Sequence, residues 1–151
     1  MTTLKVGDKA PDFSGNEATG KIITLTQFKG KKLALYFYPR DNTPGCTTEA
    51  CNLRDNYSRL LNKGYEVVGV SADNEKSHLN FINKYNLPFP LITDVDKKII
   101  KAYNAWGEKK MYGKSYEGIL RKTFIISEDG IIEKIIEKVK ISDHASQIFE
   151  N

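Results

Sequence analysis

Cys46 and Cys51 are the residues of this chain whose type and spacing could support redox chemistry, and they are its only two cysteines. A small secreted domain that depended on disulfides would usually carry more of them. In a reducing compartment, two thiols five positions apart indicate either redox chemistry or a pair of inert side chains packed as small hydrophobic groups. A zinc site is disfavoured, because the spacing is unusual for zinc and His78 and His144 lie far away in the sequence.

The segment around Cys46 favours the reactive interpretation. Thr43 is a good N-cap residue, and Pro44 would follow at the first helical position, where a missing N–H costs nothing. Cys46 would then lie in the first turn, where free N–H groups and the positive helix end both favour a thiolate. Each such interaction is worth only roughly 0.3–1 kcal/mol, so strong activation needs a further cation. The candidate cations, among which spacing does not choose, are Arg40, Arg54 and Arg121.

The five-residue spacing constrains any disulfide between Cys46 and Cys51. On one regular helix their Cα atoms would be about 8.6 Å apart, which is beyond the limit of about 7 Å for a disulfide. We therefore predict two states, a helical reduced form and an oxidised form in which the first helical turns unwind.

The apolar pattern predicts the elements that position this segment. A nearly continuous apolar run at 32–38 predicts a buried central strand that ends at Pro39, and helical spacing follows from about 44 to 62. Asp129 and Gly130 lie between two strand-like runs and indicate a hairpin. The other predicted elements are strands at 66–71, 91–93, 123–127 and 131–137, helices at 75–85 and 97–103, a C-terminal helix from Ser142, and a small hairpin of 12–14 with 22–25.

This alternation of strands and helices predicts an α/β fold of three layers, in which helices flank a central mixed sheet. Parallel pairing in the first half and an antiparallel hairpin at the end would match a thioredoxin-like fold. We expect residues 1–151 to form a single domain, because no repeat, low-complexity tract or linker interrupts the chain.

Composition and charge exclude several classes of protein. The net charge of +4 is mild and the basic residues are interspersed with acidic ones, which argues against a nucleic-acid partner. No apolar stretch has the length of a membrane span, and the N-terminus lacks the basic start and apolar core of a signal peptide. We therefore expect a cytoplasmic protein with no membrane partner.

The residues around Cys46 also resemble a known family. Pro39, Thr43 and Cys46 match the P-x-x-x-T-x-x-C motif of peroxiredoxins. The longer string DNTPGCTTEACNLRD is similar to the bacterioferritin comigratory protein, or peroxiredoxin Q, subfamily. Further similarity lies in the opening VGDKAPDF and the later GILRKTFIIS, so the resemblance covers nearly the whole chain. It implies a thioredoxin-like fold and a thiol-dependent peroxidase.

The resemblance implies a role for each matching residue. Cys46 resembles the peroxidatic cysteine, which attacks hydrogen peroxide or an organic hydroperoxide and becomes a sulfenic acid. Cys51 resembles the resolving cysteine, which then forms an intramolecular disulfide. Thr43 resembles the residue whose hydroxyl bonds the thiolate and the peroxide, and Pro39 the residue that shields the pocket from water. Arg121 resembles the arginine that holds the thiolate and orients the peroxide.

The family further implies partners and the absence of a cofactor. Glu49 matches a carboxylate that lies near the site in this subfamily. Recycling by thioredoxin or a related dithiol reductant is implied, without metal, haem or flavin. Because Cys51 could resolve Cys46 within one chain, the resemblance suggests a monomer.

Two other functions remain open from the sequence. A thioredoxin-like disulfide reductase would be expected to carry C-x-x-C, whereas four residues separate Cys46 from Cys51. A non-catalytic, redox-responsive binding or chaperone module could use the helix unwinding as a switch.

Other polar and aromatic side chains have simpler interpretations. Trp106 is predicted to lie in a loop at 104–116 that caps the site or the core, with contact to substrate as the alternative. Asp94 and Asp96 could suggest a metal pair, but a turn before the next helix explains them better.

The histidines and a charged pair on the first long helix are not assigned to the site. His78 is predicted to lie on the surface of its helix, and His144 has no evident partner. Arg54 and Asp55 are predicted to form an ion pair on the helix surface or in packing.

Overall fold

Residues 3–150 are described by the computed structural model, apart from the side chain of Met111. In chain order the elements are β1 Ser14–Asn16, β2 Ile22–Thr24, the 3₁₀ helix η1 Leu25–Phe28, β3 Lys32–Phe37, α1 Pro44–Asp55, α2 Tyr57–Asn62, β4 Tyr65–Ser71, α3 Glu75–Tyr85, β5 Leu91–Thr93, α4 Lys98–Ala102, β6 Trp106–Met111, β7 Lys114–Ile119, β8 Lys122–Ile126, β9 Ile132–Ile136, the 3₁₀ helix η2 Ile141–Asp143 and α5 His144–Phe149.

A central mixed sheet has the strand order β5-β4-β3-β8-β9. β3 pairs in parallel with β4, and β4 with β5, whereas β8 is antiparallel to both β3 and β9. The prediction of parallel pairing in the first half and an antiparallel hairpin at the end is confirmed. β1 with β2, and β6 with β7, form two smaller antiparallel pairs.

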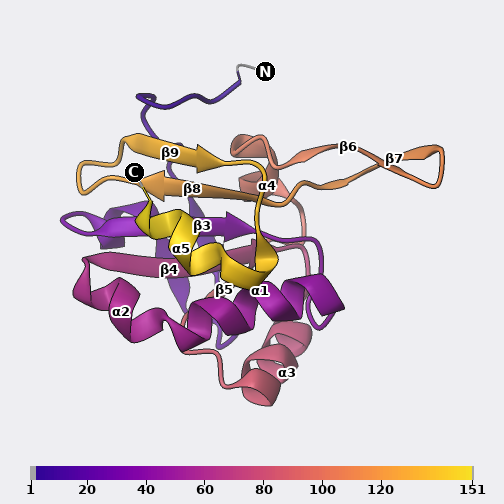
Figure 1. Ribbon diagram of the computed structural model, residues 1–151, viewed down its shortest axis with the longest axis horizontal. Helices are drawn as coiled ribbons and strands as arrows, with labels where there is room; N and C mark the ends of the chain where they lie inside the picture. The colour runs from indigo at the N-terminus through magenta and orange to yellow at the C-terminus, as the bar shows by residue number, and fades with distance from the viewer. Residues whose placement is uncertain (1–2, 151) are drawn as a thin grey trace.

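Successive side chains of β3 point to opposite faces of this sheet, and each set packs in a hydrophobic cluster. Leu33 and the odd-numbered residues after it pack in a cluster with Ile99 and Ile100 of α4. Tyr36 and its even-numbered neighbours pack in a second cluster that contains Leu53 of α1 and residues of α2, α3 and α5. In Figure 1, α1, α2 and α5 lie together along the sheet. Burial on both faces explains why β3 reads as a continuous apolar run, and the predicted α/β fold is confirmed.

The helix predicted over 44–62 is two helices, because helical structure is interrupted at Asn56 between α1 and α2. The Asn56 side-chain amide donates to the carbonyl of Asn52 at 2.8 Å. A short amide side chain that bonds nearby backbone competes with the helical hydrogen bonds, which is why such residues often end helices. The C-terminal helix likewise begins as the short 3₁₀ turn η2 before α5.

The prediction of a loop at 104–116 is wrong, because this segment forms the β6–β7 hairpin. Tyr112 and Gly113 make its two-residue turn, and both have positive φ, at 52° and 78°. That conformation matches the twist of paired strands. The hairpin projects away from the sheet (Figure 1), and most of the β7 side chains are exposed. A hairpin that is exposed on both faces needs no alternation of apolar and polar residues. Its sequence therefore lacks the pattern that predicts a strand.

The predicted small N-terminal hairpin exists with shifted bounds, since Ser14–Asn16 rather than 12–14 pairs with Ile22–Thr24. Among the described residues, none of the helices combines the length and the apolar character that crossing a membrane requires.

Gly69 of β4 offers a test of how tightly the residues of the central sheet pack. A Cβ atom there would lie 2.7 Å from Leu91 Cδ2 and 2.9 Å from Tyr36 Cζ. We expect Gly69→Ala to lower the free energy of unfolding by about 1–3 kcal/mol, because both neighbours are buried and must shift. Urea denaturation measures this change. In the control Gly118→Ala, the nearest atom belongs to the flexible side chain of Lys109, at 3.2 Å, and equal midpoints for the two variants would contradict the packing.

Candidate active site

Cys46 lies in the first turn of α1, the first helix after the central strand β3. Thr43 occupies the N-cap in extended conformation and Pro44 the first helical position. The Thr43 hydroxyl, however, donates to the carbonyl of Arg40 at 2.9 Å and does not cap the helix. The predicted helix start is therefore correct in position, whereas capping by the Thr43 side chain is not observed. Cys46 itself is only 2% exposed.

Arg121, in the connection between β7 and β8, is the arginine that contacts Cys46. Its Nη2 lies 3.3 Å from Cys46 Sγ, and its Nη1 donates to Glu49 Oε1 at 2.6 Å. Burial acts to lower the pKa of Arg121, but Glu49 and Cys46 outweigh it and raise the pKa, so the guanidinium stays charged. Arg54 instead pairs with Asp55 at 3.0 Å, as predicted.

Glu49 is fully buried one helical turn after Cys46. Burial raises the pKa of this carboxyl to about 7, against the opposing effect of Arg121. Its second oxygen, Oε2, has no hydrogen-bond partner within residues 3–150. Beside Cys46, therefore, the protein holds a carboxyl group that changes charge near neutral pH.

His144 of α5 belongs to this buried network. The prediction that His144 has no evident partner is therefore wrong. Its Nε2 lies 2.7 Å from Thr123 Oγ1 and 3.6 Å from Glu49 Oε2, and its Nδ1 lies 2.8 Å from Gln147 Oε1. Burial lowers the pKa of His144, opposed by the bond to Gln147. The neutral ring thus donates from Nδ1 and accepts from Thr123 at Nε2.

Cys51 lies on the same helix as Cys46, and both thiols are free. Cys51 is half-buried, whereas Cys46 is buried. This is the helical state that the spacing predicts for the reduced form. Pro39 is half-buried, two residues beyond the end of β3 at Phe37.

Asn52, the residue after Cys51, fixes α1 to the C-terminal segment. Its Nδ2 donates to the carbonyl of Ser142 at 3.2 Å, and its Oδ1 accepts from the Ala145 N–H at 2.8 Å. The helix is therefore held firmly just beyond the second cysteine.

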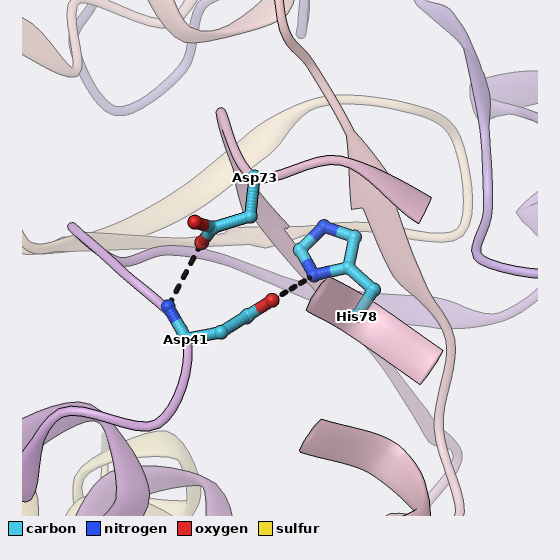
Figure 2. Close-up of side chains that lie close together, drawn as sticks. All are labelled: Asp41, Asp73 and His78. Carbon is cyan, nitrogen blue, oxygen red and sulfur yellow. Dashed lines mark hydrogen bonds and ion pairs between the residues drawn. The ribbon is translucent and has the colours of Figure 1, made fainter. Parts of the chain in front are cut away.

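A second buried cluster lies just before α1, and it corrects the prediction for His78. This ring is 0% exposed and contacts Asp41 Oδ2 through Nδ1 at 2.6 Å. The N–H of Asp41 donates to Asp73 Oδ2 at 2.8 Å (Figure 2). The three side chains have the composition of a metal site, with ligand atoms within 4.8 Å of one another. The distances shown are those of hydrogen bonds among the three residues.

The helical spacing contained a signal that would have placed both histidines correctly. His78, Phe81 and Tyr85 recur at the interval of one helix face, which is the buried face of α3. His144 shares the buried face of α5 with Ile148 in the same way.

The other set-aside residues lie away from Cys46. Asp94 accepts from the N–H groups of Ile99 and Ile100 at 3.2 and 2.7 Å, which is the predicted turn before a helix. Trp106 lies in β6 rather than in a loop and packs against the core. Its indole N–H donates to Glu117 at 3.3 Å.

Comparison with known proteins places this geometry in a family. The AhpC/TSA family model matches residues 6–135. Peroxiredoxin Bcp of Bacillus subtilis is 42% identical over 148 residues, covering 98% of this chain and 94% of the relative.

Solved structures agree with this placement. A cysteine-to-serine mutant of PrxQ from Xylella fastidiosa superimposes with a TM-score of 0.91 at 32% identity, covering 98% of this chain and 94% of the other. Xanthomonas campestris bacterioferritin comigratory protein, in structures concerned with its alkyl peroxide reduction activity, has a TM-score of 0.84 at 38% identity, covering 90% and 87%.

Replacing Glu49 by Gln tests the buried carboxyl group. The folded protein binds this proton more tightly than the unfolded chain does, since its pKa rises from 4.5 to about 7. The stability that it contributes is therefore complete below pH 4.5 and is lost as the pH rises through about 7. We expect the free energy of unfolding of the wild type, relative to Glu49→Gln, to fall over that range by on the order of 3 kcal/mol.

Urea denaturation at a series of pH values measures this difference. The control is Glu128→Gln, which removes an exposed carboxyl group in the β8–β9 turn. If the free energies of unfolding of the wild type and of Glu49→Gln differ by the same amount at every pH, the raised pKa of Glu49 is wrong.

Proposed function

We propose, from the premise that this chain belongs to the AhpC/TSA family and to its peroxiredoxin Q subfamily, that it reduces peroxides in two steps on Cys46 and Cys51. Thiol-dependent peroxidase activity is that of the family. The observation that carries the assignment to these residues is the contact of Arg121 Nη2 with Cys46 Sγ at 3.3 Å in the first turn of a helix.

In the first step, the Cys46 thiolate attacks one oxygen of the peroxide. The S–O bond forms as the O–O bond breaks, and the leaving oxygen takes a proton and departs as water or an alcohol. Cys46 becomes a sulfenic acid. Negative charge develops on both oxygens, so the fixed guanidinium of Arg121 and the helix N–H groups stabilise the transition state more than the ground state. The Thr43 hydroxyl, which donates to the Arg40 carbonyl in this structure, would rotate to donate to the peroxide. Pro39 would limit access of water.

In the second step, the Cys51 thiolate attacks the sulfur of the sulfenic acid. The S–S bond forms, the S–O bond breaks, and hydroxide takes a proton and leaves as water. Because both cysteines lie on α1, the disulfide requires its first turns to unwind. Formation of the sulfenic acid removes the negative charge that attracts Arg121, which favours this release.

An external dithiol then reduces the disulfide by thiol–disulfide exchange, and we propose thioredoxin or a related protein for this role. Hydrogen peroxide and organic hydroperoxides are the proposed substrates. Two facts support them: Cys46 is only 2% exposed, which favours small oxidants, and the Xanthomonas campestris relative is described by its alkyl peroxide reduction activity. Residues 1–151 would act as one domain and as a monomer, and a cytoplasmic location stays a prediction.

Serine variants of the two cysteines test these roles. Cys46→Ser should abolish peroxide reduction, because the nucleophile is lost. Cys51→Ser should still consume one equivalent of hydrogen peroxide per protein but fail to turn over with thioredoxin. Stopped-flow oxidation and a coupled thioredoxin assay measure the two steps. Peroxidase turnover by Cys46→Ser, or full turnover by Cys51→Ser, would refute the assignment.

Amide hydrogen exchange tests the unwinding. We expect residues 43–51 to lose protection in the disulfide form, whereas β3 and β4 keep theirs, because only the first turns of α1 need to open. Cys51→Ser, which cannot form the disulfide, is the control under the same oxidant. Matching exchange of residues 43–51 in reduced and oxidised wild type would contradict the model.

A further inference from the structure

The hydrogen bonds of His78 determine the protons on its ring. Nε2 lies 3.0 Å from the carbonyl oxygen of Ile92, which can only accept, so Nε2 carries a hydrogen. Nδ1 lies 2.6 Å from Asp41 Oδ2, a carboxyl oxygen, so a proton lies between these two atoms as well. The pair therefore holds one proton more than a neutral imidazole beside an ionised carboxylate would.

The donors around Asp41 favour the arrangement in which that proton lies on the imidazole. Tyr38 OH donates to Oδ1 at 2.5 Å, and Ser77 Oγ donates to Oδ2 at 2.8 Å. Donors on both oxygens favour the ionised carboxylate. Asp73, which follows β4, is a further acidic group facing the pair through the Asp41 N–H and favours a cation beside it. These contacts fit a buried imidazolium–carboxylate ion pair, which the NMR experiment below tests.

Helix α3 also holds the residue that follows Asp41. Asn42 has a φ of +59°, and its Oδ1 accepts from Tyr85 OH at 3.3 Å and from Lys84 Nζ at 3.5 Å. A left-handed conformation is costly for a residue other than glycine and persists where surrounding contacts determine it. Two consecutive loop residues are therefore attached to α3 immediately before the N-cap of α1.

The attachments at Asp41 and Asn42 have a counterpart at Asn52, which is bonded to the backbone of Ser142 and Ala145. Residues 43–51 lie between these fixed points and include both cysteines. The segment that must change shape in the proposed reaction is thus bounded on each side by contacts to a different helix.

We propose that Asp41 and His78 are positioning residues, whose ion pair holds the loop before α1 in the shape that peroxide attack requires and sets the N-terminal limit of the unwinding. The inference rests on the proposed function, since it gives the pair a part in the oxidation of Cys46 and in disulfide formation. The pair acts through the backbone at 41–43 and contacts neither thiol.

The protonation of His78 is tested in the wild type by ¹⁵N NMR of the imidazole rings. The chain has two histidines, and His144, neutral with a hydrogen on Nδ1, is the internal reference. We expect two protonated ring nitrogens for His78 at neutral pH and one for His144. In Asp41→Asn, the amide can donate to Nδ1, and His78 should become neutral with its hydrogen on Nε2. A neutral His78 in the wild type would overturn the ion pair.

The positioning role is tested by separating the two chemical steps in stopped flow. In Asp41→Asn we expect the phase that depends on peroxide concentration to slow about ten-fold or more, because misplaced reacting groups lose rate steeply. The later, concentration-independent phase should be unchanged or faster, since unwinding is no longer restrained. Ser77→Ala keeps the ion pair and removes one hydrogen bond to Asp41. It should change the rates of the two phases in the same directions as Asp41→Asn, but by smaller factors.

The control is Asp129→Asn, which makes the same charge change in the exposed β8–β9 turn. Equal slowing of both phases, as a general loss of structure would give, or wild-type rates in Asp41→Asn and Ser77→Ala would overturn the inference. A wild type with no peroxide-dependent phase would instead refute the proposed function itself.

Discussion

The guanidinium of Arg121 is the contact on which the arrangement around Cys46 depends. It joins the first turn of α1 to the connection before β8, and it binds the thiol and the Glu49 carboxyl at the same time. Glu49 is buried, and one of its oxygens has no hydrogen-bond partner in the part of the chain that the structure describes, which is unfavourable for an isolated carboxylate. The cation offsets this cost only while the helix is folded, so the stability of the first turn and the reactivity of the thiol share one interaction.

The helix that this interaction requires is incompatible with a disulfide between the two cysteines. A helix brings Cys46 to the arginine but keeps Cys51 too far away for a disulfide. In the proposed reaction, folding of the helix and formation of the disulfide are thus alternatives within one short segment, and the change must be confined to that segment. The contacts of Asp41 with α3 and of Asn52 with the C-terminal segment provide such limits in that reaction.

Features governed by local rules could be predicted from the sequence, and features governed by distant contacts could not. The position of Cys46 in its helix followed from Thr43 and Pro44, because helix starts depend on neighbouring residues. Arg121 lies 75 positions from Cys46, and only the family resemblance singled it out. The two histidines were misjudged because residue type was weighed above helical spacing. The β6–β7 hairpin was missed because burial, the source of the alternating pattern, is lacking there.

That hairpin has a consequence for the continuity of the chain. It projects from the body (Figure 1), with Lys110 and Lys114 exposed on either side of the Tyr112–Gly113 turn. A trypsin-like protease that nicked this turn would leave one fragment with both cysteines and another with Arg121. The pairing of β3 with β8 joins the two fragments independently of the turn. The thiol and the cation that holds it could therefore belong to separate polypeptides, which makes this turn a point at which the protein could be split into two fragments.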